Sequence, residues 1–105
     1  MATNRLEILK QMLAQDPKNA FARYGLAMEL KNTGQLDESV GEFRTLLADD
    51  ASYVAAYYHG GQTLEKLGRI GEAKEMYEKG IEASVRKGDL HTRSEIEAAL
   101  DLLPI

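Results

Sequence analysis

Two stretches of the chain repeat one pattern of residues at a spacing of 34 positions. The matched pairs are Tyr24 and Tyr58, Leu30 and Leu64, Gly34 and Gly68, Ser39 and Ala73, and Phe43 and Tyr77. A period of this length, held in register over two helices and a turn, is typical of stacked helical hairpins. Such stacks present an extended binding surface, so the pattern favours binding over catalysis.

The composition restricts the classes of partner. The chain has 105 residues, of which 44% are hydrophobic and 29% charged, and this suits one folded domain. The net charge is -4 and no dense Lys/Arg cluster occurs, so nucleic acid is not an expected partner. The sequence contains no cysteine, no apolar run long enough to span a bilayer and no signal-peptide core. We therefore expect no membrane partner and a cytoplasmic location.

Apolar residues at helical spacing predict an all-α fold of about six helices. The expected ranges are 4–15, 19–32, 36–48, a helix after a cap at Ser52 that ends at Leu67, 70–86, and a last helix that reaches residue 103. The last helix starts at Asp89 or at Thr92, where Thr92-Arg93-Ser94-Glu95 matches a capping box. Connections this short require each helix to pack antiparallel to the previous one.

Both copies resemble the tetratricopeptide repeat (TPR) pattern W-x2-L-G-x2-Y, A-x3-F, P. The matching positions are Arg23, Leu26, Ala27, Leu30, Ser39 and Phe43 in the first copy, and Tyr57, Gly60, Gly61, Leu64, Ala73 and Tyr77 in the second. Arg5, Leu9 and Pro17 stand at the A, F and P spacing. The resemblance implies a right-handed superhelix of antiparallel helix pairs in one domain: a half-repeat helix at 4–15, repeats at 20–53 and 54–87, and a capping helix at 89–103.

Two features depart from the family pattern. Arg23 replaces an aromatic residue, so its guanidinium is expected to pair or reach solvent while its methylenes cover the neighbouring helix. Gly60 and Gly61 stand together in a helix, where each costs about 1 kcal/mol relative to Ala. Close packing against Met12 or Phe43 is the favoured explanation for Gly60, and a hinge or ligand slot is the alternative.

In TPR proteins the first helices of the pairs line a concave groove, and the resemblance implies the same arrangement here. The expected groove residues are Phe21, Tyr24, Met28, Tyr58, Gln62, Thr92 and Ile96. Aromatic side chains and a methionine on such a face suit a peptide or a partner helix. The alternative is that the aromatics only pack against one another. The Lys/Asn/Arg clamp with which one TPR subfamily holds acidic chaperone tails is not recognisable here.

The sequence offers no catalytic, cofactor or metal site. His59 and His91 are the only histidines, and neither has ligands at zinc-like spacing. We therefore expect a non-enzymatic module that binds a peptide or helix of another protein in a concave aromatic groove. The alternative is a self-associating scaffold, for example a homodimer that uses the repeat ends or the groove. A small-ligand pocket at Gly60-Gly61 is the least favoured of the three.

Overall fold

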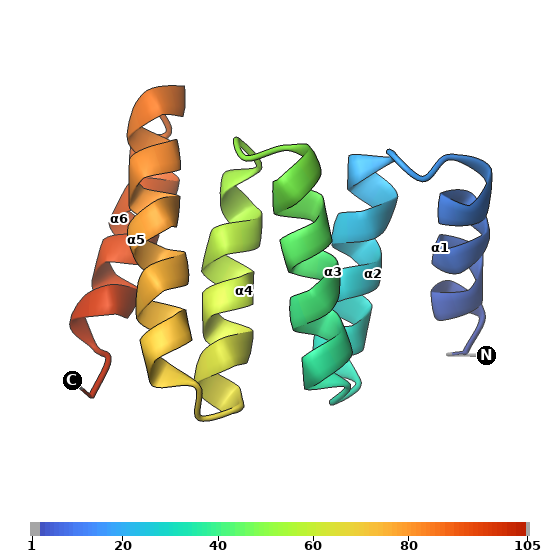
Figure 1. Ribbon diagram of the computed structural model, residues 1–105, viewed down its shortest axis with the longest axis horizontal. Coiled ribbons are helices and arrows are strands. Elements are labelled where there is room, and N and C mark those ends of the chain that lie inside the picture. Colours follow the sequence, from blue (N-terminus) through green and yellow to red (C-terminus); the bar gives the residue numbers. More distant parts are fainter. Residues whose placement is uncertain (1–2, 105) are drawn as a thin grey trace.

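The computed structural model describes residues 3–104, and this range folds into six helices without a strand. The helices are α1 (Thr3–Gln15), α2 (Ala20–Asn32), α3 (Leu36–Asp49), α4 (Val54–Lys66), α5 (Ile70–Lys87) and α6 (Leu90–Asp101). They stand in a row from α1 at one end to α6 at the other, with successive helices antiparallel (Figure 1). The prediction of an all-α fold with six helices is confirmed.

Three helices end in the same way, at a glycine whose φ is positive. Gly34, Gly68 and Gly88 have φ of 84°, 76° and 75°. The amide after Gly34 donates to the carbonyl of Leu30, and the amide after Gly68 donates to that of Leu64. This Schellman arrangement satisfies carbonyls at the helix end and reverses the chain, and a side chain would strain the left-handed backbone. Gly34 and Gly68 therefore set the tight turn inside each helix pair, and Gly88 sets the turn between α5 and α6.

The helix starts differ in part from those that the local sequence signals predict. Asn19 caps α2, since its Oδ1 accepts the amide of Ala22 at 3.0 Å. Asp89 caps α6 in the same way, since its Oδ1 accepts the amide of Thr92. Of the two predicted starts, the one at Asp89 is therefore confirmed, and the predicted capping box at Thr92 is wrong. The cap at Ser52 is also wrong: Ser52 donates to Asp50 in the preceding turn, and Tyr53 precedes α4.

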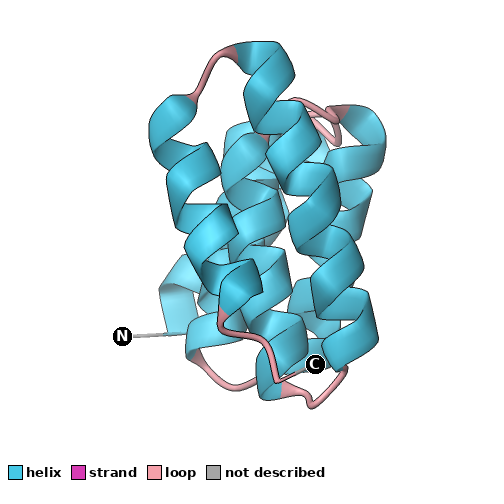
Figure 2. Cartoon of the chain, turned by 90° about the vertical axis from the view of Figure 1, so that its left-hand side faces the viewer, coloured by secondary structure: helices cyan, strands magenta, loops and turns pink. Residues whose placement is uncertain are grey.

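The helices form two layers (Figure 2). Each helix packs on its sequence neighbours, and in addition α4 contacts both α2 and α6. Within residues 3–104, α3 makes no comparable contact with α1 or α5. The layer of α2, α4 and α6 is therefore the tighter one, and we call its solvent-facing side the concave face. The other layer, α1, α3 and α5, forms the convex face.

Small residues lie where the paired helices approach most closely. Gly61 faces the ring of the fully buried Tyr77, and Gly60 faces Met76 and Phe43. The close-packing explanation is thus confirmed for Phe43, whereas Met12 lies elsewhere, in the cluster between α1 and α2. A side chain at Gly61 would collide with Tyr77, so the glycine is explained by packing.

The departure at Arg23 is compensated as expected. Its Nη1 lies 2.5 Å from Glu42 Oε1 on α3, and its Nη2 donates to the carbonyl of Pro17 at 3.1 Å. The side chain is mostly buried, with 16% of its surface exposed. Arg23 therefore replaces the aromatic packing of the family pattern with an ion pair between the helices of the first repeat.

Candidate functional site: the concave face

An aromatic cluster occupies the N-terminal half of the concave face. Tyr24 of α2 lies at its centre, with its ring centroid 5.2 Å from that of Tyr53 and 6.2 Å from that of Phe43. His59 of α4 stands 6.0 Å from Tyr24 and 5.2 Å from Tyr58, edge-on to both. Burial raises the pKa of Tyr24. Because Tyr24 contacts three rings and is half-buried, it contributes to packing as well as to the surface.

A polar cluster lies beside the aromatic one. The ammonium of Lys31 donates to Gln62 Oε1 at 2.9 Å and lies 3.3 Å from Nδ1 of His59. Burial, followed by the charge of Lys31, lowers the pKa of His59. Burial also lowers the pKa of Lys31, helped by the nearby charge of Lys66. A neutral imidazole that accepts from Lys31 therefore fits this arrangement best.

A hollow lies between α4 and α6 in the C-terminal half of the concave face. Its volume is about 380 Å³. The lining residues are Tyr58, Gln62 and Glu65 from α4, and Glu95, Ala98, Ala99 and Leu102 from α6. The hollow combines apolar lining residues with two carboxylates, and it is large enough to receive an amino-acid side chain.

The predicted groove residues fall into separate environments. Phe21 is 73% exposed at the start of α2, which makes it a large apolar side chain in solvent. Met28 is half-buried against the cluster around Phe43. Tyr58 and Gln62 both line the hollow. Thr92 is engaged locally, since its hydroxyl donates to Asp89 Oδ2 at 2.8 Å.

Ile96 is a core residue, and its prediction as a groove residue is wrong. Its side chain is fully buried and packs against Tyr57 and Gly80. The cause is the length of α5, which has 18 residues against 14 in α3. The extra turn delays α6, so Ile96 takes the core-facing place that Leu26 and Gly60 hold in α2 and α4.

The same shift explains which groove residues the 34-residue period does not predict. Glu95, Ala98, Ala99 and Leu102 line the hollow in place of Thr92 and Ile96. Counted from the first residue of each helix, Ala98 corresponds to Met28 and Gln62. The sequence signal for the later start of α6 is Gly88 followed by Asp89. This pair ends α5 beyond the position that the 34-residue period predicts from the end of α3.

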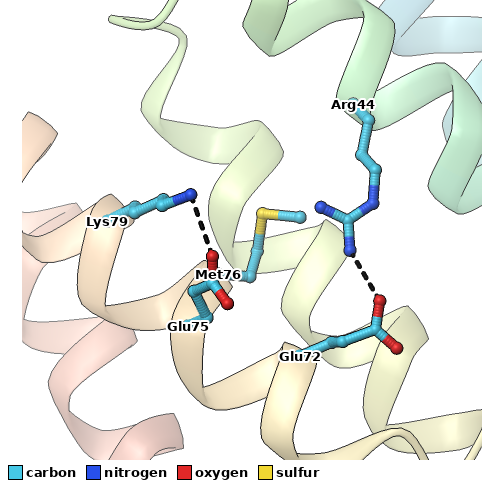
Figure 3. A pocket seen from close by; sticks show the side chains of 5 residues that line it. All are labelled: Arg44, Glu72, Glu75, Met76 and Lys79. Carbon is cyan, nitrogen blue, oxygen red and sulfur yellow. Dashed lines mark hydrogen bonds and ion pairs between the residues drawn. The ribbon is translucent and has the colours of Figure 1, made fainter.

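A second hollow lies on the convex face, where α3 and α5 diverge (Figure 3). It has a volume of about 300 Å³, with Met76 at its base and four charged residues around it. These charges neutralise each other locally: Arg44 pairs with Glu72 at 3.1 Å, and Lys79 pairs with Glu75 at 3.0 Å. The convex hollow therefore offers little to a charged partner.

Two further findings concern clustered metal-ligating side chains and membrane-spanning helices. In residues 3–104 no three His, Cys, Asp or Glu side chains come together as a metal site would require. Nor does any helix in this range have the length and apolarity needed to cross a bilayer.

Comparison with known proteins agrees with this geometry. Tetratricopeptide repeat family models match residues 6–59 and 54–84. The chain belongs to the tetratricopeptide repeat family. TPR repeats generally mediate protein–protein interaction, and the family is generally a non-catalytic repeat fold.

Individual relatives and solved structures are similar to most of the chain. The solution structure of a TPR domain protein from Salinibacter ruber is 32% identical, with 85% of this chain and 90% of that chain covered and a TM-score of 0.79. A protein of Bordetella parapertussis is 30% identical, with 93% and 85% covered and a TM-score of 0.81. A TPR repeat-containing protein of Pseudomonas aeruginosa is 24% identical over 95 residues, 90% of each chain.

Proposed function

We propose that this TPR protein is a non-enzymatic module that binds a peptide or helical segment of another protein on its concave face. The observation that carries the proposal is the hollow between α4 and α6, with Tyr58 and Leu102 in its lining and the aromatic cluster of Tyr24 beside it. Leu102 is 83% exposed, so a partner that covers it would remove apolar surface from water. The family's general role in protein interaction supports the same assignment.

The test uses two variants that alter the hollow in opposite ways. Tyr58→Ala removes its aromatic wall, and Ala98→Gln fills it from an exposed helical position. The probe is a set of peptides selected from a displayed random library by the unaltered chain. Both variants should weaken binding of these peptides by about tenfold, because central aromatic anchors dominate such interfaces.

The matched control is Val85→Ala, which truncates an exposed apolar residue on α5. It should leave peptide affinity unchanged. The proposal is refuted if the selected peptides bind Tyr58→Ala and Ala98→Gln as tightly as they bind the unaltered chain, and if all these proteins have similar melting temperatures. Since Ala98→Gln removes no packing, it separates loss of the site from loss of the fold.

A second candidate function is self-association through the ends of the stack. α1 packs on α2 alone among the described helices, and Ile8 on α1 is 55% exposed. At the other end Leu90 is 67% exposed. Light scattering over a concentration series tests this candidate: a mass that rises to that of a dimer, and falls back in Ile8→Glu, supports it, and a constant monomer mass refutes it.

We also propose that the protein acts in the cytoplasm. The absence of cysteine is compatible with a reducing compartment. Cell fractionation followed by detection of the chain tests this, and recovery outside the cytoplasmic fraction refutes it.

A further inference from the structure

The hollow between α4 and α6 has two carboxylates and no cation in its lining. Glu65 reaches it from α4 and Glu95 from α6, and its remaining residues are neutral. The apolar part consists of Tyr58, two alanines and Leu102. A ligand that enters this hollow therefore meets apolar surface and negative charge together.

Glu65 differs from the other half-buried glutamates of the chain. In the part of the chain whose side chains the structure describes, each of the others pairs with an arginine. The pairs are Arg5–Glu29, Arg23–Glu42, Arg69–Glu72 and Arg93–Glu97. Glu65 instead accepts the phenolic hydroxyl of Tyr77 through Oε2. Its second oxygen has capacity for a cationic donor, which a partly buried carboxylate normally acquires.

Glu95 is similarly short of a strong partner. Its ion-pair neighbour within the described residues is the ring of His91, 3.6 Å away, and that ring is 86% exposed. Such an exposed pair contributes little. Both carboxylates at the hollow can therefore accept a hydrogen-bonding cation without breaking a strong internal pair.

Two lysines lie in a depression that adjoins the hollow. Lys31, Gln62, Glu65 and Lys66 line that depression, which shares Gln62 and Glu65 with the hollow. The ammonium of Lys31 is held by Gln62 and His59. The charge of the concave face is thus divided unevenly, with two lysines and Glu65 at the depression, and with Glu65 and Glu95 but no cation at the hollow. An acidic side chain of a partner would be repelled from the hollow.

From this division we infer that the hollow selects a protein segment in which an apolar side chain is adjacent to a lysine or arginine. The apolar side chain rests on Tyr58, Ala98 and Leu102. The neighbouring cation donates to Glu65 and Glu95. The inference rests on the proposed binding function and specifies the chemistry of the partner, which is opposite in charge to an acidic tail.

The test begins with peptides selected from a random displayed library by the unaltered chain. The selected sequences should be enriched in Lys or Arg next to an apolar residue. Their affinity should fall by about tenfold in the variant Glu65→Gln/Glu95→Gln, since hydrogen bonds to a charged group are the strong ones. The amide oxygen at position 65 can still accept from Tyr77, so this variant should melt close to the unaltered chain.

The matched control is Glu75→Gln/Glu78→Gln, which removes two charges from exposed sites on α5. It should leave affinity unchanged, so a general effect of net charge is distinguished from a local one. Selected peptides that depend on Tyr58 but are acidic or uncharged, or that bind the Glu65→Gln/Glu95→Gln variant with undiminished affinity, overturn this inference alone. Peptides that are indifferent to Tyr58→Ala and Ala98→Gln, or a selection that yields no binder, overturn the proposed function as well.

Discussion

Replacement of Gly61 by alanine gives the sharpest test of how the second repeat is packed. A Cβ at this position would lie 2.6 Å from Cδ1 of Tyr77 and 2.7 Å from Cζ, and nearer still to Cε1. Tyr77 is fully buried, and its hydroxyl donates to Glu65. The ring is therefore held at both ends and would have to move by about 1.3–1.8 Å to reach an ordinary carbon–carbon separation.

The expected loss follows from two opposing terms. Overpacking of this kind typically costs about 1–3 kcal/mol, and the short distances place Gly61→Ala near the upper end. The higher helix propensity of alanine stabilises the folded state by about 1 kcal/mol relative to glycine. We expect a net destabilisation of about 2 kcal/mol, equivalent to a fall in Tm of about 8–16 °C for a domain of this size.

The neighbouring glycine provides the matched control. A Cβ at Gly60 would meet Met76 Cε and Phe43 Cβ at 3.5 Å, which is normal van der Waals contact. Gly60→Ala should therefore be neutral or stabilising by up to about 1 kcal/mol. Urea unfolding followed by circular dichroism measures both variants. Equal stability of the Gly61→Ala and Gly60→Ala proteins would show that contact with Tyr77 does not explain the glycine pair.

Two further predictions concern a helix cap and a titrating group. Asn19→Ala should lower the free energy of unfolding by about 1 kcal/mol, because it removes the side-chain acceptor at the start of α2, whereas Asn32→Ala at the end of that helix should change little. Urea unfolding distinguishes the two, and equal effects would contradict the cap. His59 has a lowered pKa in the fold, chiefly through burial and Lys31 and in spite of Glu95, so the unfolded chain binds the proton first as the pH falls. Its contribution to stability is therefore complete above the ordinary histidine pKa of about 6.5 and is lost as the pH falls from there through the lowered pKa of the folded state. The free energy of unfolding, measured between about pH 7.5 and about pH 5, should depend less on pH in His59→Gln than in the unaltered chain. An unchanged pH profile would contradict this.

The sequence contained most of the information about the fold because the repeated elements carry strong local signals. Gly34 and Gly68 end helices with a positive φ, and Pro17 follows the first helix, so these ends could be placed without tertiary contacts. Caps were less predictable. Ser52 has the right chemistry for an N-cap, yet its hydroxyl donates to Asp50 instead. Several side chains in a turn can supply the acceptor, and the backbone geometry selects among them.

The candidate site was predictable only where the repeat period holds. Tyr58 and Gln62 lie on the concave face because α4 repeats the register of α2. The period fails after α5, where one additional helical turn moves Ile96 into the core and brings Ala98 to the surface. The charges at the hollow depend on how α4 and α6 approach in three dimensions. A pattern within either helix alone could not indicate that Glu65 and Glu95 share one site.

The most direct test of the concave binding face is a titration of the isotopically labelled chain with a selected peptide, followed by amide chemical shifts. We expect the largest shifts to cluster on α4 and α6 around Tyr58, Glu65 and Ala98, which line the hollow. Shifts confined to the convex hollow around Arg44 and Lys79 would contradict it.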